Sequence, residues 1–367
     1  MRLLFLLLLA PLLFAACEDD EGGSTATDSF DRGALLAHLA DNLIQPAYAD
    51  LDGRLADLLT ATEAFAGTDA EAAATPERLA DVRTAFRAAY RSWQSLSPLV
   101  TVPGEELNLQ FRLNTYPTDA DRLEASLSGD TDLDLPSNFA IQGFPAIEYL
   151  LYVDEEKLFG APVNPGDLGP LRRRGRLLKL VRTAGELVGA GRAEWGRSRD
   201  AFVANDGNSA SASVDRFVND FIFNYEKITR AGKVGIPAGV FSNTPLPDRA
   251  EAPYLADGAS REFLRAALAA TRAPFAGAPG RPDLTSYLDA LNVTRDGEPL
   301  SARIRTQFDR IDAAVAALGP NLDETVRSDN AAMLAAYDEM QRLVVLLKVD
   351  MLQALGINVD FVDADGD

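Results

Sequence analysis

The sequence predicts an all-α protein built from helical bundles. Apolar residues recur at helical spacing through most of the chain, no segment shows a convincing two-residue alternation, and Pro- and Gly-rich stretches separate the helical segments. The chain has 367 residues, and 351 remain once a predicted signal of sixteen residues is removed. A chain of that length forms two domains or one large helical unit.

The N-terminus has the features of an export signal. Residues 1–16, MRLLFLLLLAPLLFAA, combine one arginine with an apolar run, and Ala15 and Ala16 precede Cys17. The run LFAAC resembles a bacterial lipobox, so we expect Cys17 to be lipidated and to anchor the protein in the cell envelope, on the periplasmic or surface face of the outer membrane. Residues 17–30 are acidic, small and polar, which predicts a flexible tether.

The helical segments follow one another along most of the chain. Clear apolar stripes run through 39–65, 79–96, 214–228 and 333–355, and weaker ones run through 168–204, 258–272 and 299–318. Pro46 should kink the first helix because it removes one backbone hydrogen bond. Ser328 can cap the start of the last helix, and Gly356 can close its end in a left-handed conformation. Both ends of that helix are therefore marked.

Two stretches interrupt the helical pattern. Residues 160–170 (GAPVNPGDLGP) and 235–253 (GIPAGVFSNTPLPDRAEAP) are dense in proline and glycine. The first is the predicted linker between an N-terminal half, residues 31–159, and a C-terminal half, residues 171–367. The second is long for a plain connector, and loops of such length are often functional or pinned across a site.

The composition excludes several classes of function. Cys17 is the only cysteine and His38 the only histidine, which excludes HExxH zinc proteases and, with Cys17 lipidated, disulfides and cysteine-ligated zinc. A catalytic triad using His38 would lack a nucleophile elbow. Any metal site must use mainly carboxylate and carbonyl oxygens, which favours a hard metal ion such as iron or calcium. A formal charge of −20 makes nucleic acid a poor partner.

Charged residues lie inside three apolar helical segments. Glu148 lies within FPAIEYLL, and Lys348 and Asp350 lie within LVVLLKVDML. A third group follows FIFNY and consists of Glu226, Lys227, Arg230 and Lys233. Because burying an unpaired ion costs several kcal/mol, a buried charge usually has a partner. Salt-bridge networks between helices and a ligand pocket are the two explanations that remain open.

These charged segments and their neighbours resemble the imelysin family of bacterial exported and lipid-anchored proteins. Six stretches carry the resemblance, in this order along nearly the whole mature chain: IQPAY (44–48), FRAAYRSW (86–93), FRLNTYPTD (111–119), QGFPAIEYLLY (142–152), YEKITRAGKVGIPAG (225–239) and LLKVDMLQALGINVDFVDADGD (346–367). The resemblance implies two helical-bundle halves packed together. The long Pro- and Gly-rich stretches are then their connecting loops.

The hallmark of the family is GxHxxE, and this chain carries only part of it. Gly143 and Glu148 match the glycine and the glutamate, whereas Pro145, which offers neither a metal ligand nor an exchangeable proton, replaces the histidine. The family's placement of the motif between the halves would set Glu148 in a binding cleft, as a candidate metal ligand. Other candidates for this cleft are polar residues in apolar or family-like stretches: Arg112, Asn114, Tyr116, Glu226, Lys233, Lys348 and Asp350.

Three functions remain open on this sequence. We expect a non-catalytic binding protein of the cell envelope, linked to iron or nutrient uptake, because no catalytic constellation is present. The second function is a carboxylate-dependent metallopeptidase of the imelysin family, with Glu148 as metal ligand or general base. The third is a scaffold partner of an outer-membrane transport complex, in which Glu148 closes a buried ion pair.

Overall fold

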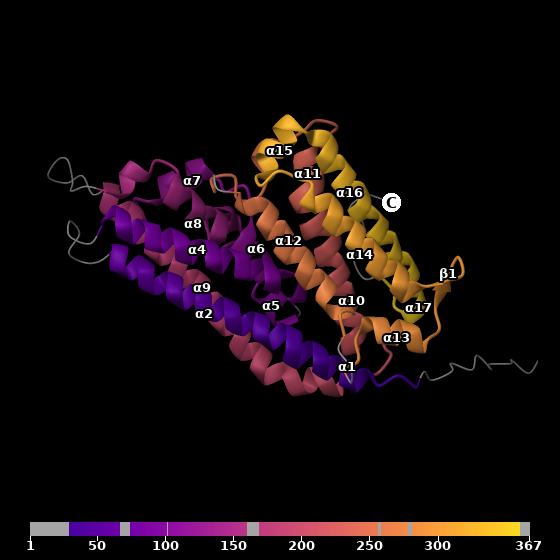
Figure 1. Ribbon diagram of the computed structural model, residues 1–367. Helices are drawn as coiled ribbons and strands as arrows, with labels where there is room; N and C mark the ends of the chain where they lie inside the picture. Colours follow the sequence, from indigo (N-terminus) through magenta and orange to yellow (C-terminus); the bar gives the residue numbers. More distant parts are fainter. Residues whose placement is uncertain are drawn as a thin grey trace, which may run out of the picture.

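Two helical bundles lie side by side in the protein (Figure 1). The computed structural model describes residues 29–66, 74–100, 102–159, 169–255, 258–277 and 281–359. Within these ranges the only strands are β1 (Thr294–Arg295) and β2 (Glu298–Pro299), which pair antiparallel. The prediction of an all-α protein is confirmed.

Part of the predicted organisation lies outside the described residues. This part includes the signal (1–16), Cys17 with the tether as far as residue 28, and residues 160–168 of the predicted linker. Across the residues that the structure does describe, no helix combines the length and the hydrophobicity that crossing a bilayer requires.

The first bundle, indigo to magenta in Figure 1, is built around three long helices. These are α2 (Gln45–Ala66), α4 (Pro76–Leu96) and α9 (Gly169–Ala204), and α2 packs against both of the others. The shorter elements are α1 (Arg32–His38), η1 (Leu39–Ile44), η2 (Ser97–Leu99), α5 (Val102–Glu106), α6 (Leu109–Asn114), α7 (Ala120–Ser126), η3 (Pro136–Ile141), α8 (Gly143–Tyr152) and η4 (Glu155–Leu158).

The second bundle, orange to yellow in Figure 1, contains the remaining helices. Its longer members are α10 (Ser213–Phe223), η5 (Asn224–Gly235), α12 (Ala259–Arg272), α14 (Leu300–Ala316) and α16 (Asn330–Val344). Its shorter members are α11 (Ile236–Ala238), η6 (Pro247–Arg249), η7 (Ala273–Phe275), α13 (Leu284–Ala290), α15 (Leu322–Ser328), η8 (Val345–Met351) and α17 (Leu352–Leu355).

The packing of α9 differs from the predicted division at residues 160–170. This helix of 36 residues packs along α2 and against α8, so it belongs to the first bundle although the prediction assigns it to the second half. Its buried face, which includes Leu177, Leu180 and Val188, covers the first bundle. The chain therefore passes to the second bundle between α9 and α10, after residue 204.

The ends and turns of several helices follow from single residues. Pro46 is the second residue of α2 and follows η1, which is a wider π-helical turn. In a regular α-helix the proline ring would crowd the carbonyl four residues earlier, so the irregularity predicted at Pro46 is this π-helical turn. The predicted cap at Ser328 is wrong, because Ser328 ends α15 and the Asp329 side chain accepts from the backbone N–H of Ala332 at 3.2 Å. Gly356 closes α17 with a φ of 68°, as predicted.

Aromatic packing joins the two bundles through α4 and α12. The Tyr90 ring of α4 stacks on Phe144 of α8, with centroids 4.7 Å apart, and meets Phe263 of α12 at 4.6 Å. At the partly exposed edge of this contact, Arg87 pairs with Glu262 at 2.7 Å. A partly exposed pair of this kind contributes little, so the buried rings supply most of the stabilisation.

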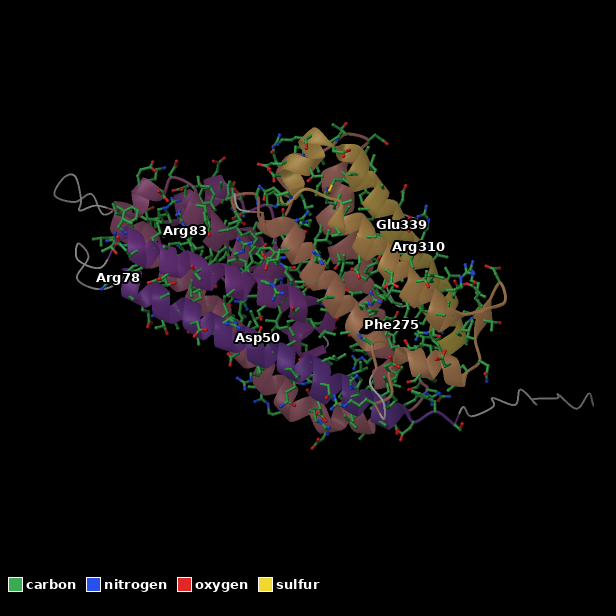
Figure 2. All side chains as sticks on the ribbon, in the orientation of Figure 1. Asp50, Arg78, Arg83, Phe275, Arg310 and Glu339 are labelled. Carbon is green, nitrogen blue, oxygen red and sulfur yellow. The ribbon has the colours of Figure 1, made fainter. Side chains whose placement is uncertain are left out.

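Two contacts hold α8 in the first bundle. Arg83 of α4, labelled in Figure 2, donates to the Leu151 carbonyl at 2.6 Å and so satisfies a backbone acceptor at the end of α8. At the other end, Gly143 has a φ of 72°, and a Cβ there would lie 2.4 Å from the Leu113 carbonyl oxygen and 2.5 Å from that of Arg112. Only glycine permits this approach of α8 to α6.

We expect Gly143→Ala to lower the free energy of unfolding by roughly 2 kcal/mol or more, because the methyl group meets backbone atoms and the left-handed conformation disfavours alanine. Urea unfolding followed by circular dichroism measures the change. The matched control is Gly53→Ala in α2, where a Cβ meets nothing within 4 Å and helix propensity should raise stability by up to about 1 kcal/mol. Equal effects of the two substitutions would contradict this account.

Candidate functional site

A cluster of buried polar side chains lies where the two bundles meet, and we name it the polar centre. Its members come from α4, α6, η5 and the segment after η6, and they are Tyr90, Gln94, Asn114, Lys233 and Glu251. None of the five is more than 5 % exposed. Their polar atoms therefore depend on one another for hydrogen bonds.

Glu251 is the acceptor in the middle of the polar centre. Its Oε1 accepts from Asn114 Nδ2 at 2.7 Å and from Gln94 Nε2 at 2.9 Å. The Tyr90 hydroxyl lies 3.2 Å from the same oxygen and 2.7 Å from Asn114 Oδ1, and its single proton serves one of these two acceptors. Oε2 of Glu251 accepts from the Lys233 ammonium in a buried salt bridge. Because both oxygens are hydrogen-bonded, the interactions offset much of the cost of burying the charge.

Lys233 supplies the positive charge of the polar centre. Its Nζ also donates to Gln94 Oε1 at 2.7 Å and lies 6.0 Å from the centre of the Tyr116 ring. Burial lowers the pKa of Lys233, and the neighbouring Glu251 carboxylate opposes that shift. Burial raises the pKa of the Tyr116 hydroxyl well above its usual range, so this phenol stays neutral. The pair of Lys233 and Glu251 therefore carries the charge of the site.

The backbone around Glu251 is held in an uncommon conformation. Ala252 has a φ of 52°, in the left-handed region that residues with a Cβ rarely adopt. Two anchors hold this turn: the Glu251 side chain in the polar centre, and the Tyr254 N–H, which donates to Glu148 Oε1 at 2.7 Å. The end of the long loop at residues 235–253 is thus fixed across the junction between the bundles.

Glu148 lies on α8 beside the polar centre and is 1 % exposed. Burial raises the pKa of Glu148 to about 8, the backbone N–H of Tyr254 opposes that shift, and the charge of Glu251 adds to it. Glu148 is therefore mainly protonated at neutral pH. Lys233 is left to balance the charge of Glu251 alone.

The motif helix α8 does not line an open cleft. Gly143 is the first residue of α8 and Pro145 the third, where the missing N–H would have no helical partner. Glu148 follows one turn later, and every residue of 143–151 is buried. The carboxyl group lies in a packed interior, which differs from the expected binding cleft.

A second buried cluster accounts for other charges in the apolar helices. Lys348 of η8 donates to Glu226 of η5 at 2.9 Å, and Arg230 lies 3.7 Å from the same carboxylate. Arg230 also donates to the Tyr337 hydroxyl of α16. These contacts connect helices within the second bundle, so a salt-bridge network explains them without a ligand.

The structure divides the residues predicted for one cleft into separate groups. Asn114 and Lys233 belong to the polar centre, and Tyr116 and Glu148 lie beside it. Glu226 and Lys348 belong to the second cluster. Asp350 pairs with Arg295 of β1. Arg112 pairs with the exposed Asp134 at 2.5 Å. The expectation of one shared cleft is therefore not met, because Glu226, Lys348, Asp350 and Arg112 are each paired with a residue outside the polar centre.

The side chains of the polar centre do not form a binding site for a metal ion. The Lys233 ammonium occupies the position beside Glu251 Oε2 that a metal cation would need. Throughout the described ranges, no three His, Cys, Asp or Glu side chains are grouped as metal ligands. This geometry does not support Glu148 as a ligand for iron or calcium.

Sequence reasoning missed Glu251, the residue at the middle of the site. A glutamate in a Pro- and Gly-rich loop is usually solvated, and nothing in its own neighbourhood marks it as buried. The feature of the sequence that pointed to this region was the length of the loop at residues 235–253, because loops of that length are often held across a site. Tyr90 lies within the apolar stripe predicted for residues 79–96, and its hydroxyl shows that a core position also contributes a polar contact.

The fold and the motif helix can be compared with known proteins. The imelysin (peptidase M75) family model matches residues 44–349, which cover most of the chain and all of α8. The chain belongs to the imelysin family. A search of curated proteins finds no match to this imelysin-family chain.

Two solved structures share the imelysin fold seen here. One is an imelysin-like protein from Psychrobacter arcticum 273-4, with a TM-score of 0.69 and 17 % identity, over 90 % of this chain and 97 % of that one. The other is a "putative iron-regulated protein A precursor" from Parabacteroides distasonis, with a TM-score of 0.69 and 17 % identity, over 90 % and 96 % of the chains. At this identity the similarity establishes the fold.

We expect Lys233→Met to lower the free energy of unfolding by about 3–5 kcal/mol, because it leaves Glu251 charged, buried and without a cationic partner. Denaturant unfolding of Lys233→Met, Glu251→Gln and the double variant completes a double-mutant cycle. The double variant should lose less stability than the two single variants together. Additive losses would show that the two charges do not depend on each other.

We expect the stability of the wild type to depend on Glu148 between about pH 4.5 and pH 8. The folded-state pKa lies above the ordinary value of 4.5, so the protonated group stabilises the fold at low pH, and this contribution is lost as the pH rises through about 8. Glu148→Gln stays neutral, so its stability relative to wild type should rise by up to about 1.4 kcal/mol per pH unit in that window.

Urea unfolding at pH 5, 6, 7 and 8 measures this difference for Glu148→Gln. The control is Asp338→Asn, which removes an exposed carboxylate of α16 and should follow the wild-type curve. Parallel curves for wild type and Glu148→Gln would mean that Glu148 titrates as an ordinary carboxylate.

Proposed function

We propose that this imelysin-family protein is a non-catalytic binding protein of the bacterial cell envelope that serves iron or other nutrient acquisition. One observation carries the non-catalytic part of the proposal. Glu148, the motif carboxylate, is 1 % exposed and accepts from a backbone N–H, so it is not placed to activate a water molecule on a substrate. Pro145 removes the histidine that the family motif carries at this position.

The chemistry around the motif supports the same conclusion. The groups that surround Glu148 are already engaged, because the Glu251 carboxylate accepts hydrogen bonds from Gln94, Asn114 and Lys233 of the polar centre. A hydrolytic site needs a nucleophile or an activated water near exposed donors for the substrate. The polar centre instead joins the bundles, which supports a structural use of the motif.

Two observations support the link to iron. A neighbour that shares the fold carries the name "putative iron-regulated protein A precursor". The formal charge of −20 favours cationic over anionic ligands near the surface. Together they make nutrient acquisition the preferred setting for a binding protein of this family.

The proposed location depends on the lipobox-like run before Cys17. Expressed in a bacterium with its signal, the protein should be recovered in the membrane fraction because acyl chains on Cys17 anchor it. Cys17→Ser should shift it to the soluble fraction after cell disruption. Recovery of both forms in the soluble fraction would contradict the anchor.

We expect the purified protein without its signal to show no chelator-sensitive cleavage of unfolded casein, with or without added calcium or ferric citrate. The reason is that Glu148 is sealed from substrate. Gel analysis of the digest measures cleavage, and Glu148→Gln serves as the matched variant because it keeps the shape of the side chain. Cleavage that a chelator stops and that Glu148→Gln lacks would overturn the proposal in favour of a metallopeptidase.

A further inference from the structure

A cavity of about 320 Å³ lies between α9 of the first bundle and α10 of the second. We name it the α9–α10 pocket. Its lining includes none of the residues of the polar centre and neither Glu148 nor Tyr116. A volume of this size is within the range of pockets that hold small molecules. The motif region therefore does not account for it.

Aromatic side chains form one part of the wall of the α9–α10 pocket. Trp195 and Phe202 of α9 meet edge to face with centroids 5.1 Å apart, and Phe217 of α10 also lines the cavity. Trp195 is 2 % exposed and Phe217 is 1 % exposed, so both rings are fixed by packing. A rigid aromatic wall of this kind suits a flat apolar group or a cation.

Carboxylates outnumber the basic groups in the same lining. Glu106 of α5, Glu194 of α9 and Asp220 of α10 contribute acidic side chains, and Arg216 is the basic side chain beside them. Glu194 is paired with Arg197, so the excess negative charge rests on Glu106 and Asp220. An adjoining cavity of about 270 Å³ shares Asp220 and adds Glu105. The excess of negative charge beside aromatic faces favours a positively charged ligand.

The Trp195 indole supplies a second, independent observation. Its N–H is buried, and among the described residues it has no hydrogen-bond acceptor. Buried tryptophan N–H groups usually have a partner, and an acceptor atom on a bound molecule would provide one. Trp195, which lines the pocket, thus carries a donor that the described part of the fold does not satisfy.

We propose that the α9–α10 pocket binds a small organic cation with a flat apolar body and an acceptor oxygen. The cationic group lies toward Glu106 and Asp220, the apolar body packs on Trp195 and Phe217, and the acceptor oxygen takes the indole N–H. This inference rests on the proposed function of a binding protein and names a site and a ligand class for it.

Tyramine, 4-ethylphenol and 3-(4-hydroxyphenyl)propionate test the proposal, because they share the phenol ring and differ in charge. Isothermal titration calorimetry with the purified protein lacking its signal measures their affinities, and saturation-transfer NMR confirms contact. We expect tyramine to bind at least tenfold more tightly than neutral 4-ethylphenol and the anion to show no binding. Raising the salt concentration should weaken tyramine binding.

The double variant Glu106→Gln with Asp220→Asn should weaken tyramine binding at least tenfold. The control is Glu298→Gln with Asp338→Asn, which removes the same net charge from two exposed residues outside the pocket and should leave the affinity unchanged. Trp195→Phe keeps an aromatic ring but removes the N–H, and it should weaken tyramine binding. Circular dichroism confirms that each variant is folded.

Three results would overturn the pocket assignment. These are no binding of tyramine, equal binding of tyramine and 4-ethylphenol, or equal losses in the pocket and control double variants. None of them bears on the proposed function, which depends on the membrane fractionation and the casein assay. Failure of the pocket and failure of the binding-protein proposal are therefore distinguishable.

Discussion

The buried ion pair of Lys233 and Glu251 is the interaction on which the junction of the two bundles depends. Glu251 is held by donors from α4 and α6 of the first bundle and by Lys233 of η5 in the second. A glutamate left in this interior without those partners would be strongly unfavourable, so the loop that carries it has one stable position. That position brings the Tyr254 N–H to Glu148 and so fixes the motif helix as well.

Pro145, which replaces the motif histidine, lies on the helix α8 that packs inside the junction of the two bundles. The interior at the junction holds two carboxyl groups, those of Glu148 and Glu251, and one ammonium group close to them. Protonation of Glu148 removes the excess negative charge without any further cation. In this imelysin-family chain the motif thus connects helices, and its glycine and glutamate serve the close packing of α8 and the fixing of the loop.

Sequence reasoning recovers the parts of the fold that local patterns determine. Apolar periodicity identified the buried stripes of α4 and α16, and Gly356 was recognised as a helix end. Local patterns do not predict which distant segments of the chain contact one another. The weak amphipathic pattern of α9 carries no information on which bundle it covers, and a charged residue in a loop, such as Glu251, gives no local sign of burial.

The distance along the chain between the members of the polar centre also bears on how the protein folds. Glu251 lies 161 residues after Tyr90, 157 after Gln94 and 137 after Asn114. Closing such loops is entropically costly, and contacts of this range form slowly. When the chain emerges N-terminus first from the ribosome or a translocation channel, Tyr90, Gln94 and Asn114 are present before Glu251. Their polar groups stay hydrated until Glu251 has been added and can accept their hydrogen bonds. The first bundle therefore completes its buried polar contacts only after part of the second bundle has been synthesised.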